Sequence, residues 1–332
     1  MTTPYYQDDA VTLYHGDAQK IVADLSDGSV DCVVTSPPYF GLRDYGEPGQ
    51  YGLEPTPQSY VLNMRDLFNG IRRVLADDGT LWLNIGDSYS TYAGNRGKPT
   101  GIAATRSAKP WPETPTGSGL TGDRPAKNLL GIPWRLAFAL QEDGWYLRQE
   151  IIWSKRSCMP EAVTDRPSRS HEQVFLLTKS PRYWYDADAI REESDPEQVA
   201  HNDAKVYAAQ SDRASTTGQP GNVNSAGIHS RPGKPGRNAR SVWHMSMQPF
   251  AEAHFAVMPL TLAERCVMAG CKPNGVVLDP FSGSGTTGLA ATKHGRRYVG
   301  IDLSAEYLDL SLRTRLAQGA LGFEAAATAV TR

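Results

Sequence analysis

Four consecutive residues, Ser36-Pro37-Pro38-Tyr39, are a candidate for chemistry because they directly follow the apolar segment Val30–Thr35. The two prolines fix the backbone φ angle and lack N–H donors, so nearby carbonyl oxygens are left free to accept. The Ser36 hydroxyl and the Pro37 carbonyl could then hold the two N–H groups of a nucleobase amine and localise its lone pair. Tyr39 could stack on a base swung out of its duplex. Taken alone, the tetrapeptide is also typical of a structural turn after a strand.

A glycine-rich segment, residues 276–288 with the sequence VVLDPFSGSGTTG, is the second candidate. Glycines let the backbone approach a ligand closely, and the helix that follows presents N–H groups without helical partners. The segment is not a Walker A loop, because no lysine directly follows its second glycine. The next predicted strand ends at Asp302, where a carboxylate can accept hydrogen bonds from ribose hydroxyls. Together the two features predict an adenosine-containing cofactor, although each alone is also typical of a turn.

The order of these segments resembles that of the amino-specific DNA methyltransferases of the beta class, in which the catalytic tetrapeptide precedes the cofactor loop. Four shorter segments look like further blocks of that family and extend the resemblance over most of the chain: 84–87, 151–155, 170–172 and 254–256. The resemblance implies S-adenosylmethionine as cofactor and double-stranded DNA as partner. It implies direct transfer of a methyl group to the amine nitrogen, with no catalytic cysteine and no metal.

The same resemblance assigns residues to the site. The catalytic residues that it implies are Ser36, Pro37, Pro38 and Tyr39. The cofactor-binding residues that it implies are Asp17, His254, Phe255, Ala256, Pro259, Asp279, Pro280, Phe281, Ser282, Gly283, Ser284, Gly285, Thr286, Thr287 and Asp302.

Ser36 bears on the target base. Family members with Ser-Pro-Pro-Tyr mostly modify the N4 amine of cytosine, and those with Asp-Pro-Pro-Tyr mostly modify the N6 amine of adenine. We therefore expect a cytosine-N4 enzyme, with adenine-N6 as the alternative. A methyltransferase acting on RNA or a protein glutamine amide is a further alternative, which usually carries Asn-Pro-Pro-Tyr. A non-catalytic DNA-binding module is disfavoured by the intact cofactor loop.

The elements that must position these residues alternate between strand-like and helix-like spacing, which is typical of an α/β fold. The predicted strands are 11–14, 30–35, 80–85, 146–153, 173–178, 275–279 and 297–302, with a turn at 77–79. The predicted helices are 57–75, 129–142, 259–270, 286–294 and 304–317. We expect a doubly wound, mostly parallel sheet of the Rossmann-like methyltransferase type in circularly permuted order. The strand 275–279 should then be central in the sheet, although it comes late in the sequence.

Two long segments without periodicity interrupt this frame, and both are basic. Residues 88–128 and residues 201–240 each carry six lysines and arginines against two acidic residues, while the whole chain has a net charge of −2. Basic loops on a near-neutral body suit a protein that grips a phosphate backbone locally, although solvated surface charge is an equal alternative.

We predict from these segments a catalytic and cofactor-binding domain of residues 1–191 and 249–332, with an inserted target-recognition region of residues 192–248. The loop 88–128 is a second candidate for DNA contact. The predicted DNA-binding residues are Lys234, Arg237 and Arg240.

Composition excludes several other classes. No run approaches the roughly 18 apolar residues of a membrane span, and the N-terminus lacks the pattern of a secretory signal. The four cysteines form no Cys-x-x-Cys pair, which favours reduced thiols in a cytoplasmic protein over zinc ligands. The family resemblance implies a bacterial or phage-encoded, nucleoid-associated protein. Whether the chain forms a homodimer or has a cognate restriction endonuclease as partner is left open.

Overall fold

The computed structural model describes residues 2–90, 124–157, 161–193, 236–246 and 258–316. The predictions at Lys234, His254, Phe255 and Ala256 lie outside these ranges. The chain divides into two compact units, one of Met1–Tyr185 with Ser241–Arg332 and one of Asp186–Arg240. Within the described ranges, every helix is too short or too polar to cross a membrane.

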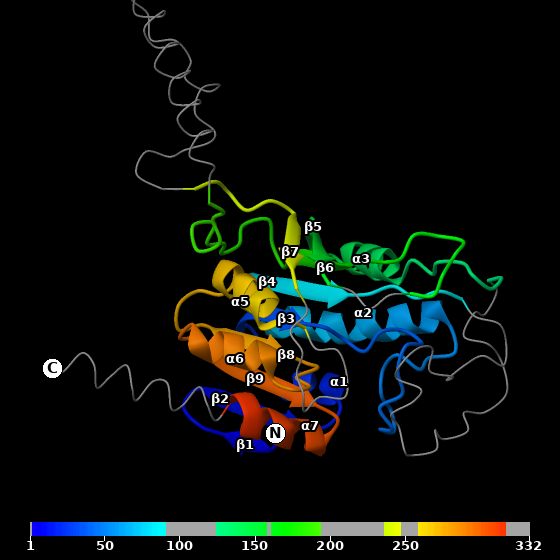
Figure 1. Cartoon of the computed structure of the whole chain (residues 1–332). Helices are drawn as coiled ribbons and strands as arrows, with labels where there is room; N and C mark the ends of the chain where they lie inside the picture. The colour runs from blue at the N-terminus through cyan, green and yellow to red at the C-terminus, as the bar shows by residue number, and fades with distance from the viewer. Residues whose placement is uncertain (1, 91–123, 158–160, 194–235, 247–257, 317–332) are drawn as a thin grey trace, which may run out of the picture. The chain divides into compact units, whose positions relative to one another are not determined.

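The first unit is built on a mixed sheet, which has nine strands in the described part of the chain, in the order β1-β2-β9-β8-β3-β4-β6-β5-β7 (Figure 1). The strands are β1 (Tyr6–Gln7), β2 (Val11–His15), β3 (Val30–Thr35), β4 (Leu75–Ile85), β5 (Tyr146–Lys155), β6 (His171–Thr178), β7 (Val242–Met245), β8 (Val276–Asp279) and β9 (Arg297–Asp302). The run from β2 through β9, β8 and β3 to β4 is parallel, whereas β1 and β6 are antiparallel to their neighbours. The predicted mostly parallel α/β sheet is confirmed, with the late strand β8 between β9 and β3.

Helices cover both faces of this sheet. One layer holds α1 (Ala18–Asp24), α2 (Pro57–Val74) and α3 (Ile132–Glu142), which contact one another in that order. The other layer holds α5 (Leu260–Gly270) and α6 (Thr286–Lys293), which lie against β3, β4, β8 and β9 (Figure 1). The chain then forms α7 (Ala305–Ser311) and a short π-helix at Leu312–Leu316. Because both faces are covered, the central strands are apolar along their length: Cys32, Val33, Val277 and Leu278 are fully buried.

The predicted turn at residues 77–79 is wrong. In the parallel pair of β3 and β4, Val30 is opposite Leu75 and Cys32 is opposite Thr80, so residues 76–79 bulge out within β4. A bulge and a turn share the same local signal, two acidic residues and a glycine, and only the neighbouring strand distinguishes them.

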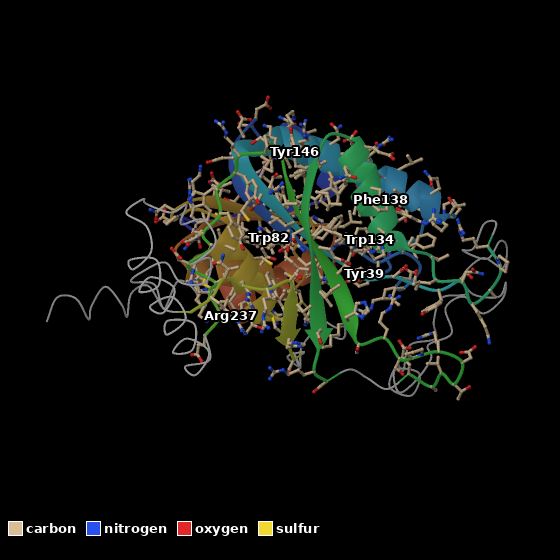
Figure 2. All side chains as sticks on the ribbon, turned by 90° about the horizontal axis from the view of Figure 1, so that it is seen from above. Tyr39, Trp82, Trp134, Phe138, Tyr146 and Arg237 are labelled. Carbon is tan, nitrogen blue, oxygen red and sulfur yellow. The ribbon has the colours of Figure 1, made fainter. Side chains whose placement is uncertain are left out.

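The strand β7 was absent from the sequence-based prediction, which assigned its residues to the irregular region 192–248. It pairs in parallel with the end of β5, where Trp153 lies opposite Trp243. The Trp243 ring is buried and stacks on Trp82 with a centroid separation of 6.2 Å (Trp82 is labelled in Figure 2). Four residues in a polar surrounding are too few for a periodic signal, so this strand depends on its tertiary partner.

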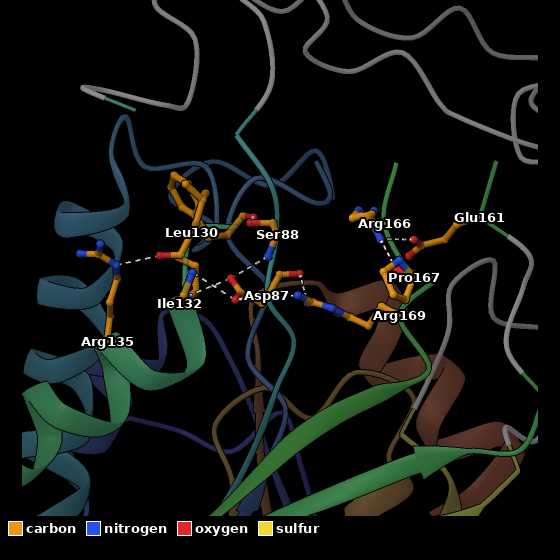
Figure 3. A network of polar contacts seen from close by, with 11 residues as sticks. Asp87, Ser88, Leu130, Ile132, Arg135, Glu161, Arg166, Pro167 and Arg169 are labelled. Atoms are coloured by element: carbon orange, nitrogen blue, oxygen red, sulfur yellow. Dashed lines mark hydrogen bonds and ion pairs between the residues drawn. The ribbon is translucent and has the colours of Figure 1, made fainter. Parts of the chain in front are cut away.

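Asp87 holds the end of β4 to the start of α3. Its carboxylate accepts hydrogen bonds from the backbone N–H groups of Gly131 (3.1 Å) and Ile132 (2.9 Å), which are the unpaired donors of the helix N-terminus. The Arg169 guanidinium donates to the Asp87 carbonyl at 2.8 Å from the segment before β6 (Figure 3). Three segments that are distant in sequence are thereby joined beside the ends of β4 and β6.

Candidate active site

A cavity of about 420 Å³ lies at the carboxyl ends of the parallel strands. Its size falls in the range of roughly 300–1,000 Å³ typical of small-molecule sites, and open α/β sheets bind their ligands at this edge. The predicted residues that line it are Asp17, Ser36, Pro37, Pro38, Tyr39, Asp279, Pro280, Phe281, Ser282, Gly283, Ser284, Thr286, Thr287 and Asp302. The two predicted segments therefore meet in one cavity.

Two predicted residues do not line the cavity. Gly285 is the N-cap of α6, with a left-handed φ of 77°, and a Cβ there would lie 2.8 Å from the Ser311 Cβ. The residue must therefore be glycine for the turn and for close packing rather than for ligand contact. Pro259 is the buried N-cap of α5, and its neighbour Met258 lines the cavity instead.

The glycine-rich loop offers polar groups to a ligand. The Ser282 N–H donates to the Ile301 carbonyl at 2.8 Å, which ties the loop to the end of β9. The Ser284 hydroxyl lines the cavity, is buried, and has no hydrogen-bond partner in the described structure. Because a buried hydroxyl without a partner is costly, this atom fits a polar group of a bound cofactor.

Asp279 ends β8 inside the cavity and is almost fully buried. Its Oδ1 accepts hydrogen bonds from the Thr35 hydroxyl (2.7 Å) and the Phe281 N–H (3.0 Å). Burial raises the pKa of this carboxyl to about 6, and these hydrogen bonds oppose the rise. A buried carboxylate at the cavity wall is suited to bind a positively charged group of a ligand.

Asp302 ends β9 at the same edge. Its two oxygens accept from the Gly283 N–H at 2.7 Å and from the Ser304 N–H at 2.9 Å, so it holds the glycine-rich loop against the start of α7. Desolvation raises the pKa of Asp302 above its usual range. Asp17 follows β2 and caps α1 by accepting from the Lys20 N–H at 3.0 Å. It lies near Asp302 because the last residue of β2, His15, is paired with Asp302.

The wall opposite the glycine-rich loop comes from the segment after the tetrapeptide, which the sequence analysis did not assign to the site. Its lining residues are Leu42, Arg43, Tyr45, Glu47, Gly49, Gln50 and Tyr51. The Tyr51 ring meets Phe281 edge to face at a centroid distance of 5.4 Å. Aromatic residues within a glycine-rich stretch directly after the tetrapeptide were the only local signal for this wall.

The tetrapeptide follows β3 and lines the same cavity. The Ser36 hydroxyl donates to the Tyr39 hydroxyl at 3.3 Å, and Tyr39 donates to Glu172 Oε2 at 2.6 Å. Desolvation and the charge of Glu172 raise the pKa of Tyr39 well above its usual value. The Pro38 carbonyl accepts a hydrogen bond from the Tyr60 hydroxyl at 2.9 Å. The sequence analysis expected the carbonyl oxygens of this segment to be free, and this one is not.

Glu172, which belongs to the family block 170–172, is a centre of polar contacts. Asn84 Nδ2 donates to its Oε2 at 3.1 Å, and Lys155 forms an ion pair with its Oε1. The Lys155 ammonium also lies 4.6 Å from the centroid of the Trp153 ring. All four side chains line the cavity, and they come from β4, β5 and β6.

Two of the predicted DNA-binding residues in the unit Asp186–Arg240 are within the described ranges. Arg237 and Arg240 each form an ion pair with Glu192, at 3.2 Å and 3.0 Å. Their contact with DNA stays a prediction, and the shared carboxylate offsets part of their positive charge.

Comparisons with known proteins indicate the same family that the sequence resembles. The family model described as DNA methylase matches residues 30–313. The chain is 46% identical to the Type II methyltransferase M.Cfr9I of Citrobacter freundii over 303 residues, which cover 91% of this chain and 86% of that protein. It is 45% identical to the Type II methyltransferase M.SmaI of Serratia marcescens over 301 residues, which cover 89% of this chain and 87% of that protein.

Two solved structures share the fold. The PvuII DNA methyltransferase (cytosine-N4-specific) matches with a TM-score of 0.61 at 17% identity, over 93% of this chain and 88% of that one. A putative DNA modification methylase from Thermus thermophilus, complexed with S-adenosyl-L-methionine, matches with a TM-score of 0.54 at 21% identity, over 92% of this chain and 95% of that one.

Proposed function

This chain belongs to the DNA methylase family, and from that premise we propose that it is a site-specific Type II methyltransferase of the beta class that methylates the N4 amine of cytosine. The relatives that share nearly half of its sequence are named Type II methyltransferases, which supports a role in restriction-modification beside a cognate nuclease.

S-adenosylmethionine is the proposed cofactor, and its chemistry when bound is to present an electrophilic methyl group. The cavity fits it on three counts: a Ser284 hydroxyl without a partner among the described residues, a buried Asp279 carboxylate, and acidic groups at Asp302 and Asp17. Asp302 would accept from ribose hydroxyls, and Asp17 would contact the adenine end. Asp279 would attract positive charge near the reacting end.

The observation that carries the choice of cytosine is the tetrapeptide Ser-Pro-Pro-Tyr, with a serine at position 36 as in the cytosine-N4 members that the sequence resembles. Because the Ser36 hydroxyl directs its proton to Tyr39, its lone pairs can accept an N–H from a base amine in the cavity. In this arrangement the Pro37 carbonyl takes the second N–H and the Tyr39 ring stacks on the base.

Methylation of a ring carbon is disfavoured because it needs a cysteine nucleophile. In the described part of the chain, Cys32, Cys266 and Cys271 are buried, and none of them lines the cavity.

Recognition of the target sequence is proposed for residues 192–248, with the loop 88–128 as a second DNA contact. The basic excess of both segments supports this assignment. The compact unit Asp186–Arg240 overlaps the proposed recognition region.

The test is to express the protein in cells, digest the DNA to nucleosides and analyse their masses. N4-methylcytosine is expected, N6-methyladenine alone would overturn the choice of base, and 5-methylcytosine would overturn the mechanism. Ser36→Ala should slow the chemical step more than it weakens cofactor binding, because the lost acceptor acts on charge that develops during transfer. The matched control is Ser29→Ala, an exposed serine before β3.

A further inference from the structure

Three side chains form a continuous line of hydrogen bonds from the cavity into the sheet. The Ser36 hydroxyl donates to Tyr39 at 3.3 Å, and the Tyr39 hydroxyl donates to Glu172 at 2.6 Å. All donors in this line point away from the position proposed for the base. A proton that arrives at Ser36 can therefore be passed on by one shift of each hydroxyl proton.

The end of this line is a carboxylate that forms an ion pair. The Glu172 side chain is 14% exposed and its ion-pair partner Lys155 is 16% exposed. Tyr39 and Lys155 are the titratable groups in contact with it, and the Asn84 amide adds a neutral donor from β4. The line therefore ends on a largely buried carboxylate that is hydrogen-bonded from three side chains.

The Tyr39 ring is held in place independently of its hydroxyl. A Cβ at Gly86 would lie 2.5 Å from Tyr39 Cε2, so the ring lies directly on the backbone at the end of β4. A Tyr39→Phe variant therefore keeps the ring that would stack on a base and removes only the central oxygen of the line.

We infer that Glu172 is the final acceptor of the proton that the base amine loses, and that Ser36 and Tyr39 carry this proton to it. This inference rests on the proposed function. It goes beyond that proposal by assigning a proton-accepting role to Glu172 and a proton-carrying role to the Tyr39 hydroxyl.

The step balances in atoms and charge. The amine nitrogen forms its bond to the methyl carbon as the carbon–sulfur bond of S-adenosylmethionine breaks, with that electron pair left on sulfur. The nitrogen proton passes to Ser36 Oγ, the Ser36 proton to Tyr39 Oη, and the Tyr39 proton to Glu172 Oε2. One sulfonium charge and one carboxylate charge disappear together, and no further reactant is needed.

The experiment measures single-turnover methyl transfer to cognate DNA across a range of pH, after the product nucleoside of the wild-type protein has been identified. Tyr39→Phe and Glu172→Gln should each reduce the rate by about 10²-fold or more, the usual contribution of general base catalysis. Affinities for S-adenosylmethionine and DNA should stay within about twofold in the Phe variant. Tyr146→Phe and Glu150→Gln, which lie on β5 outside the cavity lining, are the matched controls and should behave as wild type.

The Lys155→Met variant distinguishes a proton-accepting role of Glu172 from a purely structural one. Without the ammonium that contacts Glu172 Oε1, the pH profile of the single-turnover rate should shift.

The possible results separate the two proposals. If the wild-type protein methylates a base amine but Tyr39→Phe keeps its rate, or Lys155→Met leaves the pH profile unchanged, the relay is overturned and the proposed function stands. If the wild-type product carries no methylated amine, the proposed function itself fails.

Discussion

Asp279 offers a sharp test of how the cavity is built, because its charge is costly to the folded protein. The carboxyl is only 3% exposed, and burial raises its pKa from 3.8 to about 6. The hydrogen bonds that it accepts from Thr35 and Phe281 both end on the same oxygen, Oδ1. An Asp279→Asn variant can therefore keep its carbonyl at Oδ1 and both of these hydrogen bonds while it loses the charge.

The size and sign of the effect follow from the two pKa values. Between about pH 4 and pH 6 the folded protein keeps a proton that the unfolded chain has released, so the free energy of unfolding falls as pH rises. A rise of about two pKa units corresponds to a penalty of about 3 kcal/mol that is fully present above pH 6. Asp279→Asn should thus raise the free energy of unfolding by up to about 3 kcal/mol at pH 8 and by roughly half of that at pH 5.

Urea unfolding of the cofactor-free protein at pH 5 and pH 8, followed by tryptophan fluorescence, measures this difference. The exposed Asp9→Asn is the control and should change little at either pH. Calorimetry should show weaker binding of S-adenosylmethionine to Asp279→Asn, since a cationic ligand loses its counter-charge. If the variant is less stable than wild type at pH 8, or gains equally at both pH values, the buried charge is not the source of the penalty.

Three further predictions concern ligand contacts. Asp302→Asn replaces one carboxylate oxygen by an amide N–H donor, which then faces the backbone N–H of either Gly283 or Ser304. We therefore expect the binding free energy of S-adenosylmethionine, measured by calorimetry, to weaken by about 1–3 kcal/mol. Unchanged affinity with an intact fold would remove Asp302 from the site. Neutralising Lys234, Arg237 and Arg240 should flatten the salt dependence of DNA binding by about 0.9 per lost phosphate contact, and an unaltered slope would show that they do not touch phosphate. Glu192→Gln should act in the opposite direction and strengthen DNA binding, because Glu192 is the shared partner of Arg237 and Arg240.

The sequence predicted the frame of this protein well because its central strands are continuous apolar runs. The strands 30–35 and 297–302 are reproduced without change, and the predicted 275–279 is observed as Val276–Asp279. The tetrapeptide and the glycine-rich loop directly follow two of these strands. Parallel neighbours have their carboxyl ends at the same edge, so both segments reach one cavity although they are more than two hundred residues apart.

The sequence could not predict residues whose role depends on a distant partner. Glu172 is one glutamate in a strand, and its role in the site comes from Tyr39, Asn84 and Lys155 on three other segments. The bulge in β4 and the strand β7 likewise depend on the strands beside them.

The sequence by itself determined the fold class, the order of the elements and the two segments that bear the chemistry. These depend on local properties: the period of apolar residues, the conformational freedom of glycine and the rigidity of proline. Only the tertiary structure decided which side chains share a hydrogen bond. It joined Ser36 through Tyr39 to Glu172 and occupied the Pro38 carbonyl with Tyr60. Within the described part of the chain, it left the Ser284 hydroxyl without a partner. Hydrogen bonds require atoms to lie within about 3 Å of each other, and spacing along the chain does not specify such distances between separate strands.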